Sequence, residues 1–66
     1  MKLYVYLKSG NTCQVFNFKK VSTVRTEYEN DISDLTIEGN TTYRFIGDNQ
    51  LVVNGSEISY ITLVKE

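Results

Sequence analysis

The chain has 66 residues, and its seven basic and eight acidic side chains leave a net charge of −1. Single hydrophobic cores rarely divide below roughly a hundred residues, so we expect one small β domain over residues 1–66. The near-neutral charge gives no long-range attraction to nucleic acid or to an anionic membrane, so neither is a favoured partner.

The composition favours strands. Val, Ile, Thr, Tyr and Phe together supply 27 residues, whereas alanine, the best helix former, is absent. An all-β domain is therefore expected, and a helical bundle is not.

The first predicted element is a hairpin with a two-residue turn at Gly10-Asn11. Glycine can adopt the positive φ that the first position of such a turn requires. This register pairs Val5 with Phe16 and Leu3 with Phe18, so one face of the hairpin is strongly apolar.

The other face of this hairpin carries tyrosine. In the same register Tyr6 lies opposite Val15, and Tyr4, two residues earlier on the first strand, lies opposite Asn17. Tyrosine offers a large, rigid, amphipathic surface, which protein interfaces favour. Tyr4, Tyr6 and Val15 are thus candidate contacts for a protein partner; the alternative is that a curled sheet simply covers its second face with tyrosine.

The middle of the chain alternates less regularly. Residues 21–28 predict a third strand with Val24 facing inward, and residues 29–34 predict an acidic loop in which Ile32 is an apolar anchor. A three-residue loop at residues 39–41 then predicts a hairpin with Ile37 opposite Tyr43.

The last third predicts two further strands. A turn at Asp48-Asn49 pairs Phe45 with Val52 and leads into a short strand over residues 50–53. Residues 54–59 then predict a turn with one 3₁₀-like step before a closing strand at about residues 60–64. A β-bulge at Ser59 would restore the apolar phase equally well.

These elements predict six or seven short antiparallel strands in a meander that curls into a small, partly open barrel of the SH3 or Sm type. The expected core is Leu3, Val5, Phe16, Phe18, Val24, Leu35, Ile37, Phe45, Val52, Ile58, Ile61 and Leu63.

Residues that carry catalytic chemistry are scarce. Histidine, the commonest proton shuttle near neutral pH, is absent, and Cys13 is the only cysteine, which excludes an internal disulfide and a cysteine metal cluster. The four glycines are isolated, so no phosphate-binding loop is expected. We therefore expect no enzyme activity and no cofactor.

One cluster of carboxylates could in principle bind a hard cation or act as an acid and base pair. It comprises Glu27, Glu29, Asp31 and Asp34. The spacing is not that of an EF-hand and the closing glutamate is missing, so we interpret it as a solvated loop and expect no metal.

A nucleic-acid-binding barrel is the alternative function. The stretch VFNFKK (residues 15–20) has two aromatics at strand spacing followed by two lysines, and it is similar to the aromatic strand of cold-shock domains. Lys19, Lys20, Arg25 and Arg44 are the candidate contacts. The companion Lys-Gly-Phe motif is missing, however, and a structural role for both phenylalanines is the simpler interpretation.

The start of the chain, MKLYVYLKSG, has one lysine and then an apolar run that Lys8 interrupts, which is too short for a secretory signal. No uncharged stretch reaches the roughly 18 residues that a membrane-spanning helix needs. A cytoplasmic protein is expected.

The segments MKLYVYLKSGN, KKVSTV and EISYITLV give the chain a resemblance to small, mostly uncharacterised prophage-encoded β proteins of low-GC bacteria. The resemblance implies an accessory protein of a phage or prophage and transfers no functional residue.

The first hypothesis is therefore a non-enzymatic protein-interaction module. Because a domain of this length without disulfide or metal is only marginally stable alone, it is expected to be a homo-oligomer. A small nucleic-acid-binding barrel and a virion assembly component are the alternatives.

Overall fold

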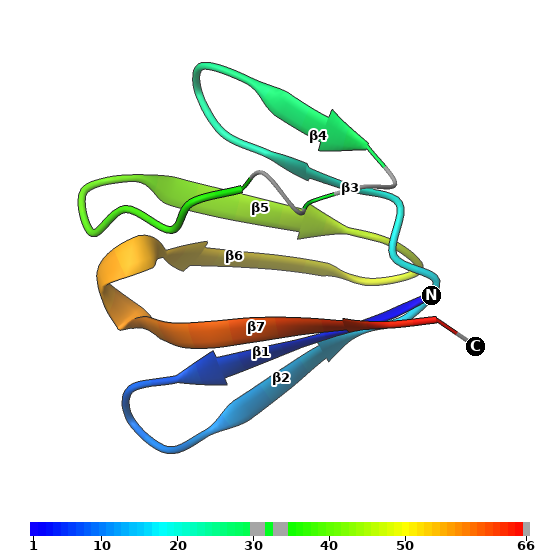
Figure 1. Cartoon of the computed structure of the whole chain (residues 1–66), viewed down its shortest axis with the longest axis horizontal. Helices are drawn as coiled ribbons and strands as arrows, with labels where there is room; N and C mark the ends of the chain where they lie inside the picture. Colours follow the sequence, from blue (N-terminus) through cyan, green and yellow to red (C-terminus); the bar gives the residue numbers. More distant parts are fainter. Residues whose placement is uncertain (30–31, 33–34, 66) are drawn as a thin grey trace.

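The computed structural model describes residues 1–29, 32 and 35–65, and these residues form antiparallel strands with a single 3₁₀ turn (Figure 1). The elements are β1 (Lys2–Leu7), β2 (Thr12–Val15), β3 (Lys20–Ser22), β4 (Glu27–Glu29), β5 (Thr42–Ile46), β6 (Gln50–Asn54), η1 (Gly55–Glu57) and β7 (Ile58–Val64). The all-β prediction is confirmed.

The strands form two sheets, with the orders β2-β1-β7 and β4-β3-β5-β6. This order departs from a meander at two places, because β5 lies beside β3 and β7 lies beside β1. Within the described residues no strand ladder joins the two sheets, so they do not close into a barrel. Since β1 and β7 are antiparallel, the two termini lie at the same end of the molecule (Figure 1).

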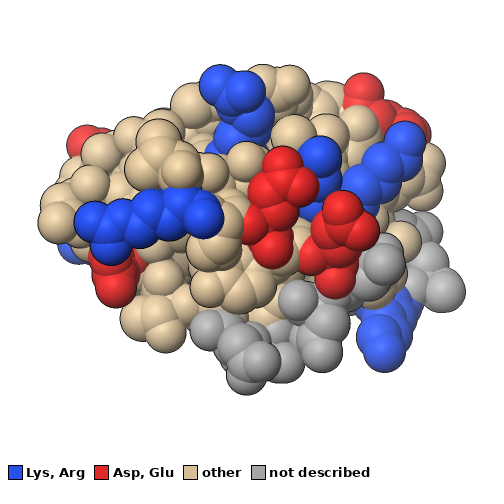
Figure 2. Space-filling model, turned by 90° about the horizontal axis from the view of Figure 1, so that it is seen from above, with Lys and Arg blue, Asp and Glu red and all other residues tan. Residues whose placement is uncertain are grey.

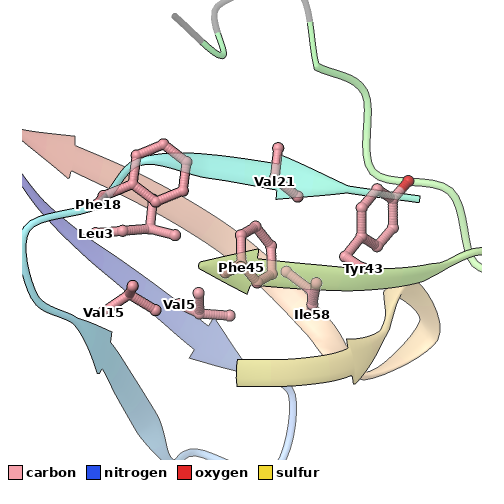
Figure 3. Close-up of a cluster of buried hydrophobic side chains, with 8 residues drawn as sticks. All are labelled: Leu3, Val5, Val15, Phe18, Val21, Tyr43, Phe45 and Ile58. Atoms are coloured by element: carbon pink, nitrogen blue, oxygen red, sulfur yellow. The ribbon is translucent and has the colours of Figure 1, made fainter. Parts of the chain in front are cut away.

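Both sheets contribute to one hydrophobic core (Figure 3). Its buried side chains are Leu3, Val5, Val15, Phe18, Val21, Tyr43, Phe45 and Ile58. Five of these were expected from the sequence, whereas Val15, Val21 and Tyr43 were not. Four other expected core residues are partly buried against the cluster: Leu35, Ile37, Ile61 and Leu63.

The turn of the first hairpin differs from the expectation. It is a three-residue loop over residues 8–10, in which Gly10 has the positive φ, 98°. The backbone N–H of Leu7 donates to the carbonyl oxygen of Asn11 over 2.9 Å, and the N–H of Gly10 donates to that of Leu7 over 3.0 Å. The glycine is needed, but as the last loop residue and not the first.

The earlier, three-residue turn changes the register by three residues. Val5 lies opposite Cys13 and Leu3 lies opposite Val15, so the predicted pairs with Phe16 and Phe18 are wrong. Because side chains alternate along a strand, an odd shift exchanges the two faces. Val15 is therefore fully buried, and Phe16 is 46% exposed.

The chain turns sharply between Phe16 and Phe18. Asn17 adopts a left-handed conformation with φ 49°, which asparagine tolerates better than most residues. Its side-chain amide donates to the Asp48 carboxylate over 2.6 Å. The reversal leaves Phe16 on the surface and directs Phe18 into the core.

The predicted strand over residues 21–28 is in fact the hairpin of β3 and β4. The Thr23 hydroxyl oxygen accepts hydrogen bonds from the backbone N–H groups of Arg25 and Thr26, over 3.2 and 3.1 Å. This local bonding stabilises a turn in place of a strand. Val24 lies in the turn and is 96% exposed, so its assignment to the core is wrong.

The segment over residues 35–38 is not a strand, and the hairpin predicted around residues 39–41 does not form. The Tyr43 hydroxyl holds this segment: it accepts from the Glu38 N–H over 2.8 Å and donates to the Thr36 carbonyl oxygen over 3.0 Å. In Figure 3 the hydroxyl points out of the core toward this part of the chain. Ile32, which belongs to the predicted acidic loop, packs against the core as expected.

Replacing Tyr43 with phenylalanine should destabilise the domain by about 1–2 kcal/mol, because two part-buried backbone groups lose their partner. Amide hydrogen exchange should locate the effect, with the Glu38 amide exchanging about tenfold faster than in the wild type. Tyr60→Phe, which removes a hydroxyl from an exposed ring, is the matched control. Unchanged exchange at Glu38 would show that the hydroxyl does not hold the segment.

The β5–β6 hairpin is shifted by one residue from the expected register. Phe45 lies opposite Leu51, with a three-residue loop over residues 47–49. Leu51 thus packs against the core, whereas Val52 is half exposed, and its assignment to the core is wrong.

The alternation of apolar and polar residues is interrupted near the end of the chain, and both expected causes, a 3₁₀ turn and a β-bulge, are present. Residues Gly55–Glu57 form the 3₁₀ turn η1, and Ile58 after it is buried. In the β1–β7 ladder Tyr6 lies opposite Tyr60 but Leu7 lies opposite Ile58, so Ser59 is an extra, bulged residue.

The side chain of Asn49 connects the two sheets. Its oxygen accepts from the Phe16 N–H over 2.9 Å, and its nitrogen donates to the Gln14 carbonyl oxygen over 2.8 Å. These two backbone groups flank Val15 on the edge of β2 that faces away from β1. The amide therefore takes the place of a neighbouring strand at that edge.

Candidate functional site

The outer face of the sheet β2-β1-β7 collects most of the exposed aromatic surface. Leu3 and Val5 point into the core, so Lys2, Tyr4 and Tyr6 point outward. The pairing of β1 with its neighbours places outward residues of β2 and β7 beside them, and Phe16, which directly follows β2, lies beside Lys2. We call this surface the tyrosine face, and it consists of Lys2, Tyr4, Tyr6, Thr12, Gln14, Phe16, Tyr60, Thr62 and Val64.

The tyrosines of this face stack on one another. The rings of Tyr6 and Tyr60 have centroids 4.3 Å apart and an interplanar angle of 16°. The ring centroids of Tyr4 and Tyr6 are 6.5 Å apart, with an interplanar angle of 25°. Because the rings cover part of each other's faces, a partner meets chiefly their edges and hydroxyl groups.

Lys2 is the only charged residue of the tyrosine face. Its ammonium group lies 5.2 Å from the ring centroid of Phe16 and 5.8 Å from that of Tyr4. Both distances allow a cation–π interaction, which retains part of its strength when water is removed.

The face is also where large apolar side chains remain exposed. Phe16, Tyr60 (56% exposed) and Val64 account for three of the five exposed large hydrophobic residues in the described chain. Such clustering on one side of a small domain is typical of an interaction surface.

Two of the three predicted protein contacts lie on this face. Tyr4 and Tyr6 are half-buried there, but Val15 is fully enclosed in the core and cannot contact a partner. The cause is the three-residue change of register, which turned Val15 inward. Phe16 and Tyr60 were not predicted as protein contacts. Tyr60 could have been, because side chains alternate along a strand, so inward Ile61 and Leu63 imply an outward Tyr60.

The predicted nucleic-acid contacts do not form a patch of one sign. Lys20 makes a salt bridge to Glu27 with a nitrogen–oxygen distance of 3.6 Å. Lys19 and Arg25 are exposed at opposite ends of β3, and Arg44 lies on β5 opposite Ser22. Figure 2 shows acidic and basic side chains interspersed over the surface seen from the β4 side of the molecule.

The pair of phenylalanines in VFNFKK is divided between surface and core. Phe16 is half exposed and Phe18 is buried, because Asn17 reverses the chain between them. They therefore do not form the two-ring platform on which single-stranded nucleic acid stacks.

The described residues contain no group of three or more histidine, cysteine, aspartate or glutamate side chains placed to bind a metal ion. Of the acidic cluster, Glu27 and Glu29 lie on β4, and Asp31 and Asp34 are outside the described residues. Cys13 is a free thiol on β2, partly buried against the core. No described helix is long and apolar enough to cross a membrane.

An open hollow of about 300 Å³ lies between the Thr23–Thr26 turn and the segment that Tyr43 holds. Its lining is mostly polar and includes Arg25, Tyr28 and Glu38. With one cation and one carboxylate, the hollow favours neither an anionic nor a cationic ligand. It is therefore a weaker candidate for a binding site than the tyrosine face.

Comparison with known protein families, curated proteins and solved structures finds no match. The tyrosine face is therefore the feature of the molecule that points most directly to a function.

Proposed function

We propose that this chain is a non-enzymatic protein-interaction module that binds a protein partner through the tyrosine face. The observation that supports it is the concentration of exposed Phe16, Tyr60 and Val64 beside the stacked Tyr4 and Tyr6, with Lys2 as the single charge. Large amphipathic aromatics with few charges are the composition of the central part of protein interfaces.

The same geometry argues against nucleic acid as the partner. A base stacks on a free ring face, but Tyr6 and Tyr60 already stack on each other at 4.3 Å. Phosphate binding needs several cations, and Lys2 is alone on the face of a chain with a net charge of −1.

The proposal includes the cellular location, the origin and the oligomeric state of the protein. We infer a cytoplasmic accessory protein of a phage or prophage, a homo-oligomer that needs no cofactor or metal. A virion assembly component would use the same face and would differ only in its partner. The two packed sheets are proposed to be an open relative of the SH3 and Sm barrels, because η1 and the following strand lead the chain back to β1.

Site-specific photo-cross-linking tests the function. A benzoylphenylalanine at Tyr60 should yield discrete protein adducts when the protein is irradiated in the cells that produce it, because Tyr60 is the most exposed ring of the face. The same residue at Val24, which is 96% exposed on the other sheet, is the control.

Three results would count against the function. Equal adducts from both positions would mean random collision, and no protein adduct from position 60 would mean that the face is unoccupied. Adducts to nucleic acid, seen as absorbance at 260 nm in the purified product, would replace a protein partner with a nucleic acid.

A further inference from the structure

Strand β7 has a free edge on the side away from β1. It forms a ladder with β1 alone (Figure 1), and its residues 59–64 make no other backbone hydrogen bond to the described part of the chain. Strand β6, which η1 joins to β7, pairs with β5 and hardly contacts β7. The edge is therefore open to a further strand.

The burial of side chains agrees with an open edge. Ile61 and Leu63 point toward the core but stay partly exposed, whereas Val5 and Leu3, their partners on β1, are fully buried. β1 has a neighbouring strand on both sides, and β7 has one on a single side. The exposure of Ile61 and Leu63 therefore arises at the unpaired side of β7.

The first hairpin shows which backbone groups of β7 point to the free edge. The Leu7 N–H donates to the Asn11 carbonyl oxygen, so the odd residues of β1 bond to β2 and the even residues bond to β7. The partners of these even residues on β7 are Tyr60, Thr62 and Val64. The N–H and C=O groups of Ile61 and Leu63 therefore point away from β1.

The other sheet edges are less suited to pairing. The edge of β2 is bonded by the Asn49 amide, β4 has three residues of which two are glutamates, and β6 ends at Asn54, whose side chain caps η1. β7 is seven residues long and contains no charge, proline or glycine. Proteins protect exposed edges with such residues or with short strands, so an edge without them is typical of a strand that pairs with another chain.

A second copy of β7 satisfies this edge. An antiparallel pair about a two-fold axis at Thr62 places Ile61 opposite Leu63 of the second copy, and Tyr60 opposite Val64. Ile61 and Leu63 then exchange both N–H···O=C bonds with their partners, so their free backbone groups are all paired. Thr62 lies opposite its own counterpart, in the non-hydrogen-bonded position between these pairs.

The side chains in this register are compatible. An aromatic residue opposite a β-branched one, and threonine opposite threonine, are pairs that stabilise sheets. Tyr60 is 56% exposed and Val64 is 40% exposed in the single chain, so pairing removes apolar surface from water. An axis nearer to the start of β7 would bring the bulge at Ser59 into the ladder, and an axis nearer to the end would leave Ile61 unpaired.

The charges at the two ends of β7 favour the antiparallel direction. Glu57 precedes the strand and Lys65 follows it, and both are exposed. Antiparallel pairing brings the start of each strand close to the end of the other, so unlike charges meet at both ends of the pair. Parallel pairing would bring like charges together.

We propose that two copies of this chain pair through β7, antiparallel and about a two-fold axis at Thr62, and so join their three-stranded sheets into one. The inference rests on the homo-oligomeric state in the proposed function and names its interface. Both tyrosine faces then lie on the same side of the joined sheet, where they stay free for a protein partner.

The pairing is expected to be reversible. Main-chain hydrogen bonds supply much of the affinity when a strand is added to a sheet. The contact is nevertheless smaller than the roughly 800 Å² that each partner buries in a standard complex. Monomer and dimer should therefore exchange, with a dimer fraction that rises with concentration.

Disulfide formation tests the register in the protein with Cys13 replaced by serine. Thr62→Cys meets its own counterpart in a non-hydrogen-bonded pair, where the Cα atoms are about 4.5 Å apart, within the range that a disulfide spans. Val64→Cys is offset from its counterpart by roughly 14 Å along the strands. On mild oxidation, Thr62→Cys should give about fivefold or more disulfide-linked dimer than Val64→Cys.

Sedimentation equilibrium tests the dimer in the protein that keeps Cys13. Thr62→Lys places two ammonium groups opposite each other at the axis, so it should lower the association constant about tenfold or more. Thr12→Lys is the matched control, because Thr12 is exposed on the same face but lies on β2, at the other edge of the sheet. It should leave the association constant unchanged.

A monomer at every concentration, equal disulfide yields from the two cysteine variants, or an equal effect of the two lysine variants would overturn the pairing. A species larger than a dimer would also overturn it, since a closed two-fold pair cannot grow. These failures are distinct from failure of the function. A dimer without a Tyr60 photoadduct to another protein would refute the partner and leave the pairing, and such a photoadduct from a monomer would do the reverse.

Discussion

Gly55→Ala is expected to destabilise the domain by about 3 kcal/mol or more, which is a large part of the roughly 3–10 kcal/mol available to a chain of this length. A Cβ on Gly55 would overlap the carbonyl oxygen of Glu38, and it would lie 2.8 Å from the carbonyl carbon of that residue and 3.0 Å from Cε2 of Tyr43. The Gly55 N–H also donates to the Thr41 carbonyl oxygen over 2.7 Å, which fixes the glycine in place.

The clash is steric and not conformational, because the only positive-φ glycine is Gly10. The contacts are mostly with backbone, so no rotamer change can relieve them, and either η1 or the segment at Glu38 must move. Thermal unfolding should therefore show a fall of more than 10 °C in Tm.

Gly39→Ala is the matched control. A Cβ at Gly39 would meet only the Cβ of Ser56, at 4.0 Å, which is an ordinary contact. Its stability should stay within about 0.5 kcal/mol of the wild type. If both variants unfolded at the same temperature, the close packing of η1 against Glu38 would be refuted.

The features that could be predicted from the sequence are those that depend on composition and on the local spacing of apolar residues. The residue types indicated an all-β domain, and the three-residue step from Ile58 to Ile61 indicated an irregularity before the last strand. The structure has that irregularity as a 3₁₀ turn followed by a bulge. A turn or bulge of this kind depends on residues that are close together in the chain, so it can be predicted from the local spacing of apolar residues.

Strand register could not be obtained in this way. The segment from Lys8 to Asn11 is compatible with a two-residue and with a three-residue loop, and nothing local decides between them. In the folded chain the choice is stabilised by residues far away, such as Asn49, whose amide binds the edge of β2. The β5–β6 hairpin likewise differs from its predicted register, by one residue.

The candidate site was predicted in part. Tyr4 and Tyr6 alternate with Leu3 and Val5 on one strand, so their outward direction follows from local period alone. Tyr60 joins them only because β7 pairs with β1, a contact between the two ends of the chain. Long-range pairing of this kind leaves no signal in a single sequence, and the extent of the face could not be predicted.

Val15→Asp and Phe16→Asp test the register directly, since the predicted and observed hairpins give them opposite roles. Val15 is fully buried in the core, and a carboxylate there would have no cation to pair with. An unpaired buried charge costs about 3–5 kcal/mol, so Val15→Asp is expected to be largely unfolded. Circular dichroism and urea denaturation would show this as a lost or strongly lowered transition.

Phe16→Asp, one residue away, should remain folded with a change within about 1 kcal/mol. Its side chain is 46% exposed, and its hydrogen bonds to Asn49 and Asp48 are made by the backbone, which the substitution keeps. The ring contact with Lys2 is lost, but the new carboxylate lies near that ammonium group. The opposite result, with Phe16→Asp unfolded and Val15→Asp folded, would restore the two-residue turn. It would also return Val15 to the outer surface, so this pair of variants decides which residues belong to the tyrosine face.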